Sequence, residues 1–539
     1  MYDGEVEVLR RIGLERLARL CGSAVLNAIK IVYNTNLDRE LAVVLVLKSG
    51  DKLFDDANLR KDIIDTLTEN ETRNLCNASK INYKNHIDGI IQLHQYYCKG
   101  YNANKSKIFV NFFNLNKRYV KKVIVDERSD SERIVSKKDE TVYLKPYLHD
   151  YQKRIKDTIL ERLSCVGSKL MVQMPTGSGK TFTSLEAVVD LLRLPFQKKF
   201  AVWIVYNNEL AEQALQSFKY IWKVKGDREL NSYRLFKDFE PCLNNEEGGM
   251  IFASFQKFNS ILTNTAHKYY NSLWNIINNT EILIIDEAHK SVAETYSQCI
   301  NAFINNGGAK ILGLTATPGR NCLEESLQLS EMFSNNITSI TDCSNNVISD
   351  AVGYLQDGRY LAKTESVEFE TGLSVAWTNQ EDKLLASLAE NTFRNEKVIE
   401  QIELSDKEND STIVFACTKD HVIALQILCI GRGIKSSYIT GDVDQVERIA
   451  ILNSFKNREF NILINADMLS TGIDLPNVNK LIITRPITSI VLYSQIIGRA
   501  LRGPKNGGNE TNKIVNLRDN ILNYPSGNFI YNSFSEYWR

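Results

Sequence analysis

The residues with the clearest chemical potential lie at positions 174–181, where the sequence reads MPTGSGKT. A glycine-rich turn that ends in Lys-Thr can surround the phosphates of a nucleoside triphosphate with backbone N–H groups. Lys180 would reach the β- and γ-phosphates, and the Thr181 hydroxyl would bind Mg²⁺. The segment therefore predicts an ATP site. Its expected ligands are Pro175, Thr176, Gly177, Ser178, Gly179, Lys180 and Thr181.

The residues on either side have the patterns that such a loop needs. Residues 169–174 form an apolar run of strand length, and residues 182–192 carry apolar side chains at helical spacing. The glycines allow positive φ angles, and the positive end of the new helix points at the phosphates. We therefore expect the loop to join a strand to a helix, which disfavours an ordinary surface turn.

A second chemical pattern is Asp286-Glu287, which follows the apolar run 282–285. Neighbouring side chains on a strand point to opposite faces, so a bend is needed to bring both carboxylates to one ligand. Asp286 would then hold Mg²⁺, and Glu287 would orient and deprotonate the attacking water. The two patterns together predict one site for ATP hydrolysis, with ATP and Mg²⁺ as cofactors.

A third pattern lies far downstream. Helical spacing places Gln495, Arg499 and Arg502 on one face, where two guanidinium groups can approach the charge that builds on the γ-phosphoryl group. Arginines used in this way contribute ~10³ to 10⁵ in rate. Because the phosphate loop and these arginines lie in separate parts of the chain, hydrolysis would require two domains to close on each other.

The elements that position these residues follow from hydrophobic patterning. Apolar residues recur at helical spacing in the N-terminal region, whereas strand-like runs alternate with helical patterns after residue 144. Such alternation predicts an α/β fold, with two tandem units of parallel sheet covered by helices on both faces. The expected division is a mainly helical domain at 1–125, a charged linker at 126–142, lobe 1 at 143–345, a connection at 346–410 and lobe 2 at 411–539.

Composition sets wider bounds. A chain of 539 residues exceeds one core, and its length suggests about three domains. Lys and Arg total 65, as do Asp and Glu, so nucleic-acid binding would need local positive charge. The apolar runs are too short to span a membrane, the ten cysteines lack CxxC pairs, and the N-terminus lacks a secretory-signal layout. We expect a soluble cytoplasmic protein without membrane partners.

In this order, the motifs resemble those of superfamily 2 helicases and translocases of the DEAH-box type, over roughly residues 143–539. Residues 148–152 resemble the family's adenine-reading segment, which implies an adenine contact by Gln152. Residues 174–181, 286–289 and 314–318 resemble motifs I, II and III, although Met174 stands where many such loops begin with Gly or Ala. The resemblance implies two RecA-like P-loop lobes, with ATP between them and a nucleic-acid strand across their tops. It also implies coupling roles for His289, Thr315 and Thr317.

In lobe 2, residues 471–474 resemble motif V and residues 495–502 resemble motif VI. This implies ATP contacts by Gly472, Asp474 and Gln495, and arginine-finger roles for Arg499 and Arg502. In motif Ia the family's usual Pro, Thr and Arg are replaced by residues 206–208, so backbone amides and Asn side chains would hold phosphates. The implied nucleic-acid contacts are Asn207, Asn208, Gln213, Ser254, Gln256, Thr418, Thr440, Gly441 and Ser470.

The resemblance favours DNA over RNA, because residues 468–476, 485–486 and 498–502 look most like those of DNA repair helicases and of motor subunits in restriction and other antiviral systems. A DEAH-type RNA helicase is the nearest alternative. An ATP-switched nucleic-acid-binding module that serves a partner effector is another, although Lys180, Glu287 and Arg499 together argue against a pure switch. The sequence has no convincing nuclease pattern, so we expect a partner nuclease, recruited by the N-terminal domain, to do any cutting.

Overall fold

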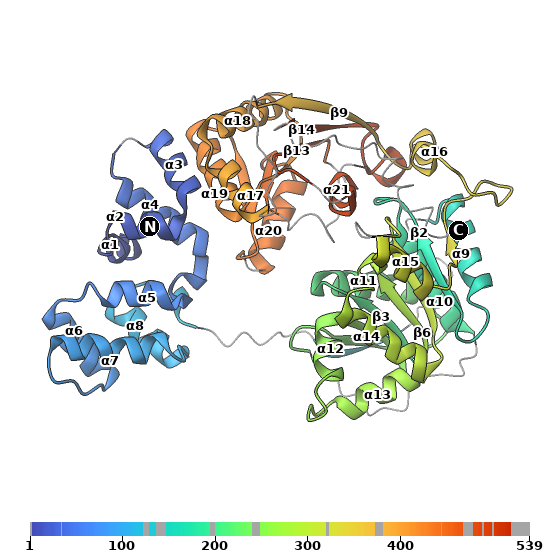
Figure 1. The fold of residues 1–539 in the computed structure, drawn as a ribbon, viewed down its shortest axis with the longest axis horizontal. Coiled ribbons are helices and arrows are strands. Elements are labelled where there is room, and N and C mark those ends of the chain that lie inside the picture. The colour runs from blue at the N-terminus through green and yellow to red at the C-terminus, as the bar shows by residue number, and fades with distance from the viewer. Residues whose placement is uncertain are drawn as a thin grey trace.

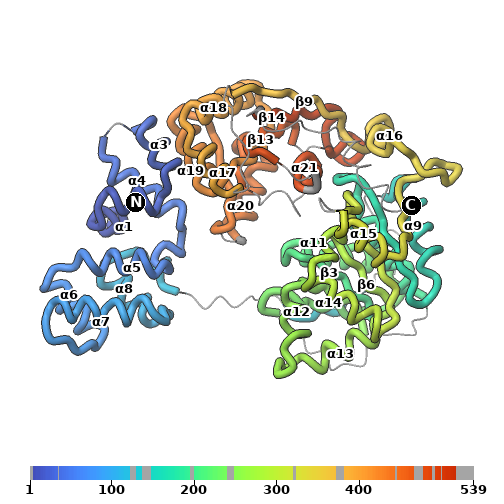
Figure 2. Tube along the Cα trace, in the orientation of Figure 1, coloured from blue at the N-terminus to red at the C-terminus, as the bar shows by residue number. Residues whose placement is uncertain are grey.

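We describe the protein from a computed structural model of its 539 residues. The described residues form a helical N-terminal domain and two α/β lobes, which Figure 1 shows as an arc with lobe 2 between the other two parts. The tube in Figure 2 follows the same arc, from the blue N-terminal helices through orange lobe 2 to green lobe 1. The structure describes residues 3–33, 35–121, 129–135, 147–194, 200–239, 248–319, 323–371, 381–443, 445–466, 478–487, 490–498 and 501–518.

The N-terminal domain is helical in its described residues. Several helices begin at a side chain that accepts a hydrogen bond from the following turn, as Asp56, Asn85 and Asn102 do. Thr68 and Glu71 form a reciprocal capping box at the start of another helix. The helices are α1 (Asp3–Arg10), α2 (Leu14–Cys21), α3 (Ser23–Val32), α4 (Leu37–Ser49), α5 (Ala57–Ile64), α6 (Glu69–Ser79), α7 (His86–Cys98) and α8 (Ala103–Phe112), with short 3₁₀ helices at Gly50–Asp55 and Lys117–Tyr119.

Lobe 1 is built on a sheet of eight strands in the order β1-β4-β5-β3-β6-β7-β2-β8, in which only the β1–β4 pair is antiparallel. Strands β3 and β5 near its middle are buried along their whole length, which matches their apolar runs. The strands are β1 (Ser131–Ile134), β2 (Lys169–Gln173), β3 (Phe200–Val205), β4 (Leu230–Leu235), β5 (Gly249–Ser254), β6 (Thr280–Asp286), β7 (Lys310–Thr315) and β8 (Ile337–Thr338). The helices are α9 (Asp150–Arg162), α10 (Lys180–Arg193), α11 (Asn208–Lys225), α12 (Phe255–Leu262), α13 (Tyr270–Asn278), α14 (Glu294–Ala302) and α15 (Leu323–Met332).

Strand β1 lies within the stretch that the sequence suggested as a linker. A charged network attaches it to the edge of lobe 1, because the buried Arg234 of β4 lies 2.5 Å from Glu132 of β1 and 2.9 Å from Glu212 of α11. The backbone N–H of Arg234 also donates to the Asp130 carbonyl, at 2.9 Å. Desolvation opposes ionisation of Glu132, but Lys219 and Arg234 outweigh it and hold the pKa of this carboxyl below its usual value. The charges at 129–134 therefore anchor the chain to lobe 1.

Lobe 2 has a six-stranded, all-parallel sheet in the order β11-β12-β10-β13-β14-β9. Strand β9 falls within the expected connection, 346–410, and pairs with β14 over its full length. The strands are β9 (Lys363–Glu370), β10 (Thr412–Phe415), β11 (Ser436–Ile439), β12 (Ile462–Asn465), β13 (Lys480–Ile483) and β14 (Thr511–Arg518). The helices are α16 (Ala351–Asp357), α17 (Glu381–Glu390), α18 (Thr392–Lys407), α19 (Lys419–Gly431), α20 (Gln445–Lys456) and α21 (Ile490–Ile497), with 3₁₀ turn Pro504–Asn506.

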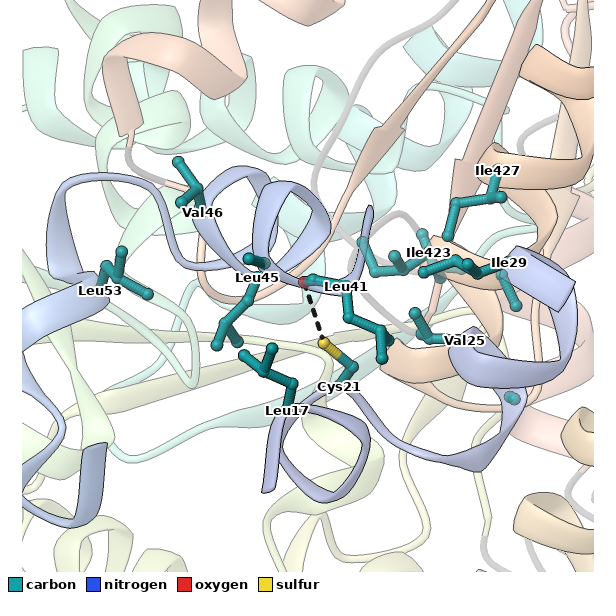
Figure 3. Packing of buried hydrophobic residues seen from close by; sticks show 14 of the residues in the cluster. Leu17, Cys21, Val25, Ile29, Leu41, Leu45, Val46, Leu53, Ile423 and Ile427 are labelled. Carbon is teal, nitrogen blue, oxygen red and sulfur yellow. Dashed lines mark hydrogen bonds between the residues drawn. The ribbon is translucent and has the colours of Figure 1, made fainter. Parts of the chain in front are cut away.

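The N-terminal domain packs against lobe 2 through a shared hydrophobic core. Val25 and Ile29 of α3 belong to the same buried cluster as Ile423 and Ile427 of α19, and Figure 3 shows these side chains side by side. Asn27 adds a hydrogen bond from its side-chain amide to the Glu390 carbonyl of α17, at 3.1 Å. The domain is therefore part of the body of lobe 2 in this structure.

The predicted fold class is confirmed: two parallel-sheet α/β lobes follow a mainly helical N-terminal domain. Continuous apolar strands buried on both faces give the parallel sheets, and periodic apolar faces give the helices. Among the residues that the structure describes, no helix is both long enough and apolar enough to cross a bilayer.

Candidate ATP site and nucleic-acid interface

The glycine-rich loop lies between β2 and α10, where the sequence predicts it. Gly177 and Gly179 have φ angles of 84° and 83°, a left-handed conformation that side chains with a Cβ adopt only under strain. The Ser178 hydroxyl and backbone N–H both donate to the Pro175 carbonyl, at 2.6 Å and 3.2 Å. These bonds close the turn directly in front of α10, whose first residue is Lys180. Positive charge from this helix end and from Lys180 therefore meets at the loop.

Helix α9 supports the loop from behind. The Tyr151 hydroxyl and the Gln152 side-chain amide both donate to the Ser178 carbonyl, at 2.8 Å and 2.9 Å. The Gln152 carbonyl oxygen accepts from the His149 backbone at 2.8 Å, so both ends of this buried side chain are engaged. A Cβ at Gly179 would overlap the Gln152 amide, which explains why the loop has glycine here. Gln152 thus braces the phosphate loop; its contact with adenine stays a prediction.

The bend that the acidic pair requires occurs at Glu287. This residue has φ 54° and ψ 48°, in the left-handed region, and its backbone N–H donates to Asp286 Oδ1 at 3.0 Å. As a result, Glu287 Oε1 lies 3.9 Å from Lys180 Nζ. The strand end and the phosphate loop therefore converge, and the structure brings Lys180, Asp286 and Glu287 into one site.

The electrostatics of Asp286 fit a divalent cation. Burial raises the pKa of its carboxyl to about 6, and the neighbouring Glu287 adds to this, whereas Lys180 and a hydrogen bond from the Thr181 hydroxyl oppose it. A buried carboxylate beside a hydroxyl and a second carboxylate is the hard oxygen set that Mg²⁺ prefers. Thr181 and Asp286 would hold the ion, as the sequence predicts for them.

A buried hydrogen-bonded chain links the acidic pair to the end of β7. His289 Nδ1 lies 3.4 Å from Glu287 Oε2 and 3.1 Å from Thr315 Oγ1. The Thr315 hydroxyl donates to the Thr317 carbonyl at 2.9 Å and accepts from the Thr317 backbone N–H at 3.0 Å. The Thr315 carbonyl accepts from the Met174 backbone N–H at 3.0 Å. The three predicted coupling residues are therefore linked by hydrogen bonds. Through the Met174 backbone, this series of hydrogen bonds reaches the start of the phosphate loop.

Lobe 2 reaches the phosphate loop through the end of α21. A Cβ at Gly498 would overlap the Thr176 side chain, and a Cβ at Gly177 would lie 3.6 Å from Leu501 Cβ. Gln495 is buried on α21, and its Nε2 has no hydrogen-bond partner within the described part of the chain. Arg502, which follows α21 in the sequence, is half-buried. Four predicted site residues lie outside the described residues: Ser470, Gly472, Asp474 and Arg499.

A second contact between the lobes was not predicted from the sequence. His149 Nε2, in lobe 1, lies 2.9 Å from Asn506 Oδ1 in lobe 2. The Tyr360 ring packs on those of His149 and Tyr151, with centroids 4.6 Å and 5.0 Å apart. The Lys505 ammonium lies over the Tyr360 ring, 4.2 Å from its centroid. Aromatic residues near the phosphate loop were the available signal, but their partners are distant in sequence.

Three of the predicted nucleic-acid contacts share a structural role. Asn207 and Thr418 follow the carboxyl end of a strand, Ser254 is the last residue of β5, and each of the three caps the next helix. Their side-chain oxygens accept from the backbone N–H groups of Glu209 at 2.8 Å, Lys257 at 3.3 Å and His421 at 3.1 Å. The half-buried Thr418 hydroxyl keeps a proton that can be donated to a phosphate, whereas Ser254 is almost fully buried. Three helix starts thus present positive dipole ends, which suit a polyanion.

The other predicted nucleic-acid contacts that the structure describes differ in their exposure to solvent. Asn208 is half-buried, and its Oδ1 has no hydrogen-bond partner in the described residues, whereas Gln213 and Gln256 are exposed. Thr440 is buried and Gly441 is exposed at the end of β11. The exposed amides and the Gly441 backbone can meet a ligand directly, while Thr440 would need its backbone to do so.

Two contacts connect these helix starts to the rest of the site. The Lys290 ammonium, just after the acidic pair, lies 3.1 Å from the centroid of the Tyr206 ring at the start of the motif Ia segment. Across the lobes, Arg448 of α20 lies 2.5 Å from Glu209 Oε1 of α11, and the arginine is almost fully buried. Sequence reasoning missed Arg448, because a lone arginine on a helix gives no local sign of a partner in another domain.

Comparisons with known proteins agree with this geometry. Residues 145–320 match a family model described as "Type III restriction enzyme, res subunit", and residues 394–504 match "Helicase conserved C-terminal domain". The chain is 31% identical over 383 residues to the candidate ATP-dependent helicase IRC3 of Saccharomyces cerevisiae, covering 67% of this chain and 50% of the relative. It is 24% identical over 332 residues to the ATP-dependent RNA helicase DBP3 of Scheffersomyces stipitis, covering 60% and 55%.

Among solved structures, a fragment of a candidate HsdR subunit of a type I restriction enzyme from Vibrio vulnificus has a similar fold. The TM-score is 0.50 at 18% identity, and the match covers 70% of this chain and 65% of that one. The chain spans about half the length of the curated relatives that it matches. These comparisons support the two-lobed helicase architecture.

Proposed function

This chain belongs to superfamily 2, with a helicase core of the restriction type, and on that premise we propose that it is an ATP-dependent helicase or translocase that acts on DNA. The observation that carries the proposal is the convergence of Lys180, Asp286 and Glu287 in lobe 1, beneath a loop that Gly498 of lobe 2 touches. Hydrolysis at such a site depends on the position of lobe 2, and that dependence is what a motor needs.

Each residue has a defined task in this proposal. Lys180 binds the β- and γ-phosphates, and Glu287 orients a water molecule and accepts its proton. His289, whose Nδ1 lies close to Glu287 Oε2, helps to position this carboxylate. When bound by Thr181 and Asp286, Mg²⁺ neutralises charge on the phosphates. Arg499 and Arg502 follow Gly498 and would approach the γ-phosphate from lobe 2.

The same geometry suggests how hydrolysis is coupled to movement on a strand. Thr315 and Thr317 extend the buried chain from Glu287, and Lys290 and Arg448 connect the ATP site and lobe 2 to the start of α11. Opening or closing of the lobes would therefore change the spacing between strand contacts on α11 and α12 and those on α19. Alternating grip at these helix starts would move the strand.

DNA is favoured because the lobe 1 match is to a family model described as the res subunit of a type III restriction enzyme. An RNA substrate is the competing proposal, since a relative is named as an RNA helicase. Phosphate contacts at helix starts carry no base information, so the site geometry accommodates either polymer.

The decisive experiment measures ATP hydrolysis with single- and double-stranded DNA and RNA as separate stimulants. We expect DNA to stimulate hydrolysis, and Lys180→Ala to abolish it while the protein remains folded. Stimulation by RNA alone would replace the DNA assignment with the RNA-helicase alternative. Hydrolysis that survives Lys180→Ala would overturn the proposed site.

The biological setting belongs to the same proposal. A motor of restriction or antiviral defence, or of DNA repair, would be served by a separate nuclease, because no nuclease pattern is present in this sequence. The N-terminal domain is the candidate docking point for such a partner. Affinity capture with the full-length chain should recover a nuclease; recovery of none would count against this part.

A further inference from the structure

Helices α3 and α19 pack along their whole length and in the same direction. Gly22, just before α3, lies so close to Asp420 in the first turn of α19 that a Cβ there would overlap the carboxylate. At the other end, a Cβ at Gly431 would lie 2.7 Å from Val32 Cγ2. Because the starts meet and the ends meet, the N-terminal domain places a fixed set of residues at the start of α19.

The charged residue in that set is Lys48, in the last turn of α4. Its Nζ lies 2.6 Å from Asp420 Oδ1 and donates to the Cys21 carbonyl at 3.4 Å. The Lys48 side chain is 20% exposed and that of Asp420 is 41% exposed, so solvent reaches the pair only in part. Lys48 therefore neutralises a carboxylate of lobe 2 from another domain.

This carboxylate stands where a phosphate backbone is expected to approach. Asp420 is two residues after Thr418, which caps α19 and keeps a hydroxyl proton to donate. A second carboxylate, Asp442, follows Gly441 and pairs with Lys419 at 3.1 Å. Two negative charges thus flank the predicted strand contacts of lobe 2, and each has a lysine partner.

We propose that Lys48 is a positioning residue for nucleic-acid binding: by neutralising Asp420, the N-terminal domain keeps the start of α19 acceptable to a phosphate backbone. This inference rests on the proposed function, because it requires a strand at Thr418. Lys419 serves Asp442 from within lobe 2, whereas Asp420 depends on the docked domain. The N-terminal domain is then a component of the strand-binding surface in addition to any role in recruiting partners.

The test measures binding of a fluorescently labelled single-stranded DNA oligonucleotide to the full-length chain by anisotropy. Lys48→Met should weaken binding about fivefold, since it leaves Asp420 unpaired beside the strand. Asp420→Asn should bind at least as tightly as the wild type, and the double variant should match Asp420→Asn. Lys48→Arg, which keeps the charge, should bind like the wild type.

Lys30→Met is the matched control, because Lys30 is an exposed lysine of α3 and its loss changes the net charge equally. Equal weakening by Lys30→Met and Lys48→Met would reduce the effect to net charge and overturn the inference. A double variant as weak as Lys48→Met, or weaker binding by Asp420→Asn alone, would also overturn it. The Asp420→Asn measurement stands even if Lys48→Met fails to fold.

Failure of the inference is distinct from failure of the proposed function. A wild-type chain that binds neither DNA nor RNA would remove the proposed function. Wild-type binding that falls with Thr418→Ala but is unchanged by Lys48→Met would remove only the role of Lys48.

Discussion

The two lobes have the same kind of parallel sheet, but they use the polar residues buried at its carboxyl ends for different purposes. In lobe 1, Asp286, His289 and Thr315 lie at the ends of β6 and β7 and connect directly to the phosphate loop. In lobe 2, the equivalent network fixes the ends of β10 and β13. It consists of Arg394, Asn395, Cys417, His421 and Thr484.

The lobe 2 network holds backbone and helices together. Arg394 of α18 donates to the Thr484 carbonyl and lies 3.8 Å from Cys417 Sγ. His421 Nδ1 accepts from the Cys417 backbone N–H at 3.1 Å, and its Nε2 faces Asn395 Oδ1 at 2.9 Å. The buried polar groups of lobe 1 thus line the proposed ATP site, whereas those of lobe 2 support the fold. Substitutions in the first should alter rates at constant stability, and those in the second should alter stability.

The largest expected effect comes from removing the arginine by which lobe 2 is proposed to act on ATP bound to lobe 1. If Arg499 is the arginine finger that we propose, Arg499→Ala should lower the rate of ATP turnover by about 10³ to 10⁵, because the variant lacks the positive charge proposed to act on the γ-phosphate. Affinity for ATP should change much less, as measured by nucleotide titration beside a steady-state ATPase assay. A variant with weakened ATP affinity but unchanged turnover would argue against an arginine finger.

The next largest expected effect concerns Glu287, the proposed catalytic base of lobe 1. Glu287→Gln should lower turnover by about a thousandfold, because the amide cannot accept a proton, while the site still binds ATP. Equilibrium binding of a fluorescent ATP analogue and thermal unfolding should both resemble the wild type. If the variant loses ATP binding as well, Glu287 is needed to build the site, and the comparison between the lobes weakens.

A pH experiment tests the supporting role of lobe 2. Burial, aided by Arg394, lowers the pKa of His421 to about 3, whereas an unfolded histidine has a pKa of about 6.5. As the pH falls, His421 is protonated in the unfolded chain before it is protonated in the folded protein. Its contribution to the free energy of unfolding is therefore fully present above pH 6.5 and decreases as the pH drops toward 3. At pH 5 the loss should be about 2 kcal/mol relative to neutral pH.

Denaturant unfolding of the wild type and of His421→Gln across this pH range would measure the effect. The variant should be less stable at neutral pH but should lose less stability on acidification. Identical acid profiles for His421→Gln and the wild type would contradict the assignment.

The smallest expected effect concerns the ion pair that spans the lobes. Arg448→Ala and Glu209→Gln should each weaken the coupling between ATP and strand binding, and a double-mutant cycle should give ~1 kcal/mol for the pair, since Glu209 is about one-third exposed. The quantity to measure is DNA affinity with and without an ATP analogue. Additive effects in the cycle would mean that the contact does not couple the lobes.

The sequence was most informative where the chemistry is local. Lys180 and Thr181 follow their glycines directly, and Asp286 and Glu287 are adjacent, so spacing alone predicted the loop and the need for a bend. Pairs such as Arg448 with Glu209 and His149 with Asn506 join distant segments, and neither partner has a local pattern that indicates the other.

Two structural surprises have physical explanations in the sequence. Segment 126–142 is charged enough to suggest a solvated linker, yet Glu132 is held at the sheet edge by the buried Arg234 of a distant strand. Helix α19 carries apolar residues around most of its circumference, and most of them are buried. That pattern was the available sign that another domain covers lobe 2.

The shared core between α3 and α19 changes how the N-terminal domain can be studied. A truncation that removes residues 1–125 would expose Ile423 and Ile427 to water and leave an apolar patch on lobe 2. Loss of activity in such a truncation would then report aggregation as readily as a missing partner. Point substitutions on the full-length chain are therefore the informative route, and an expression design that begins at lobe 1 should first replace these apolar residues with polar ones.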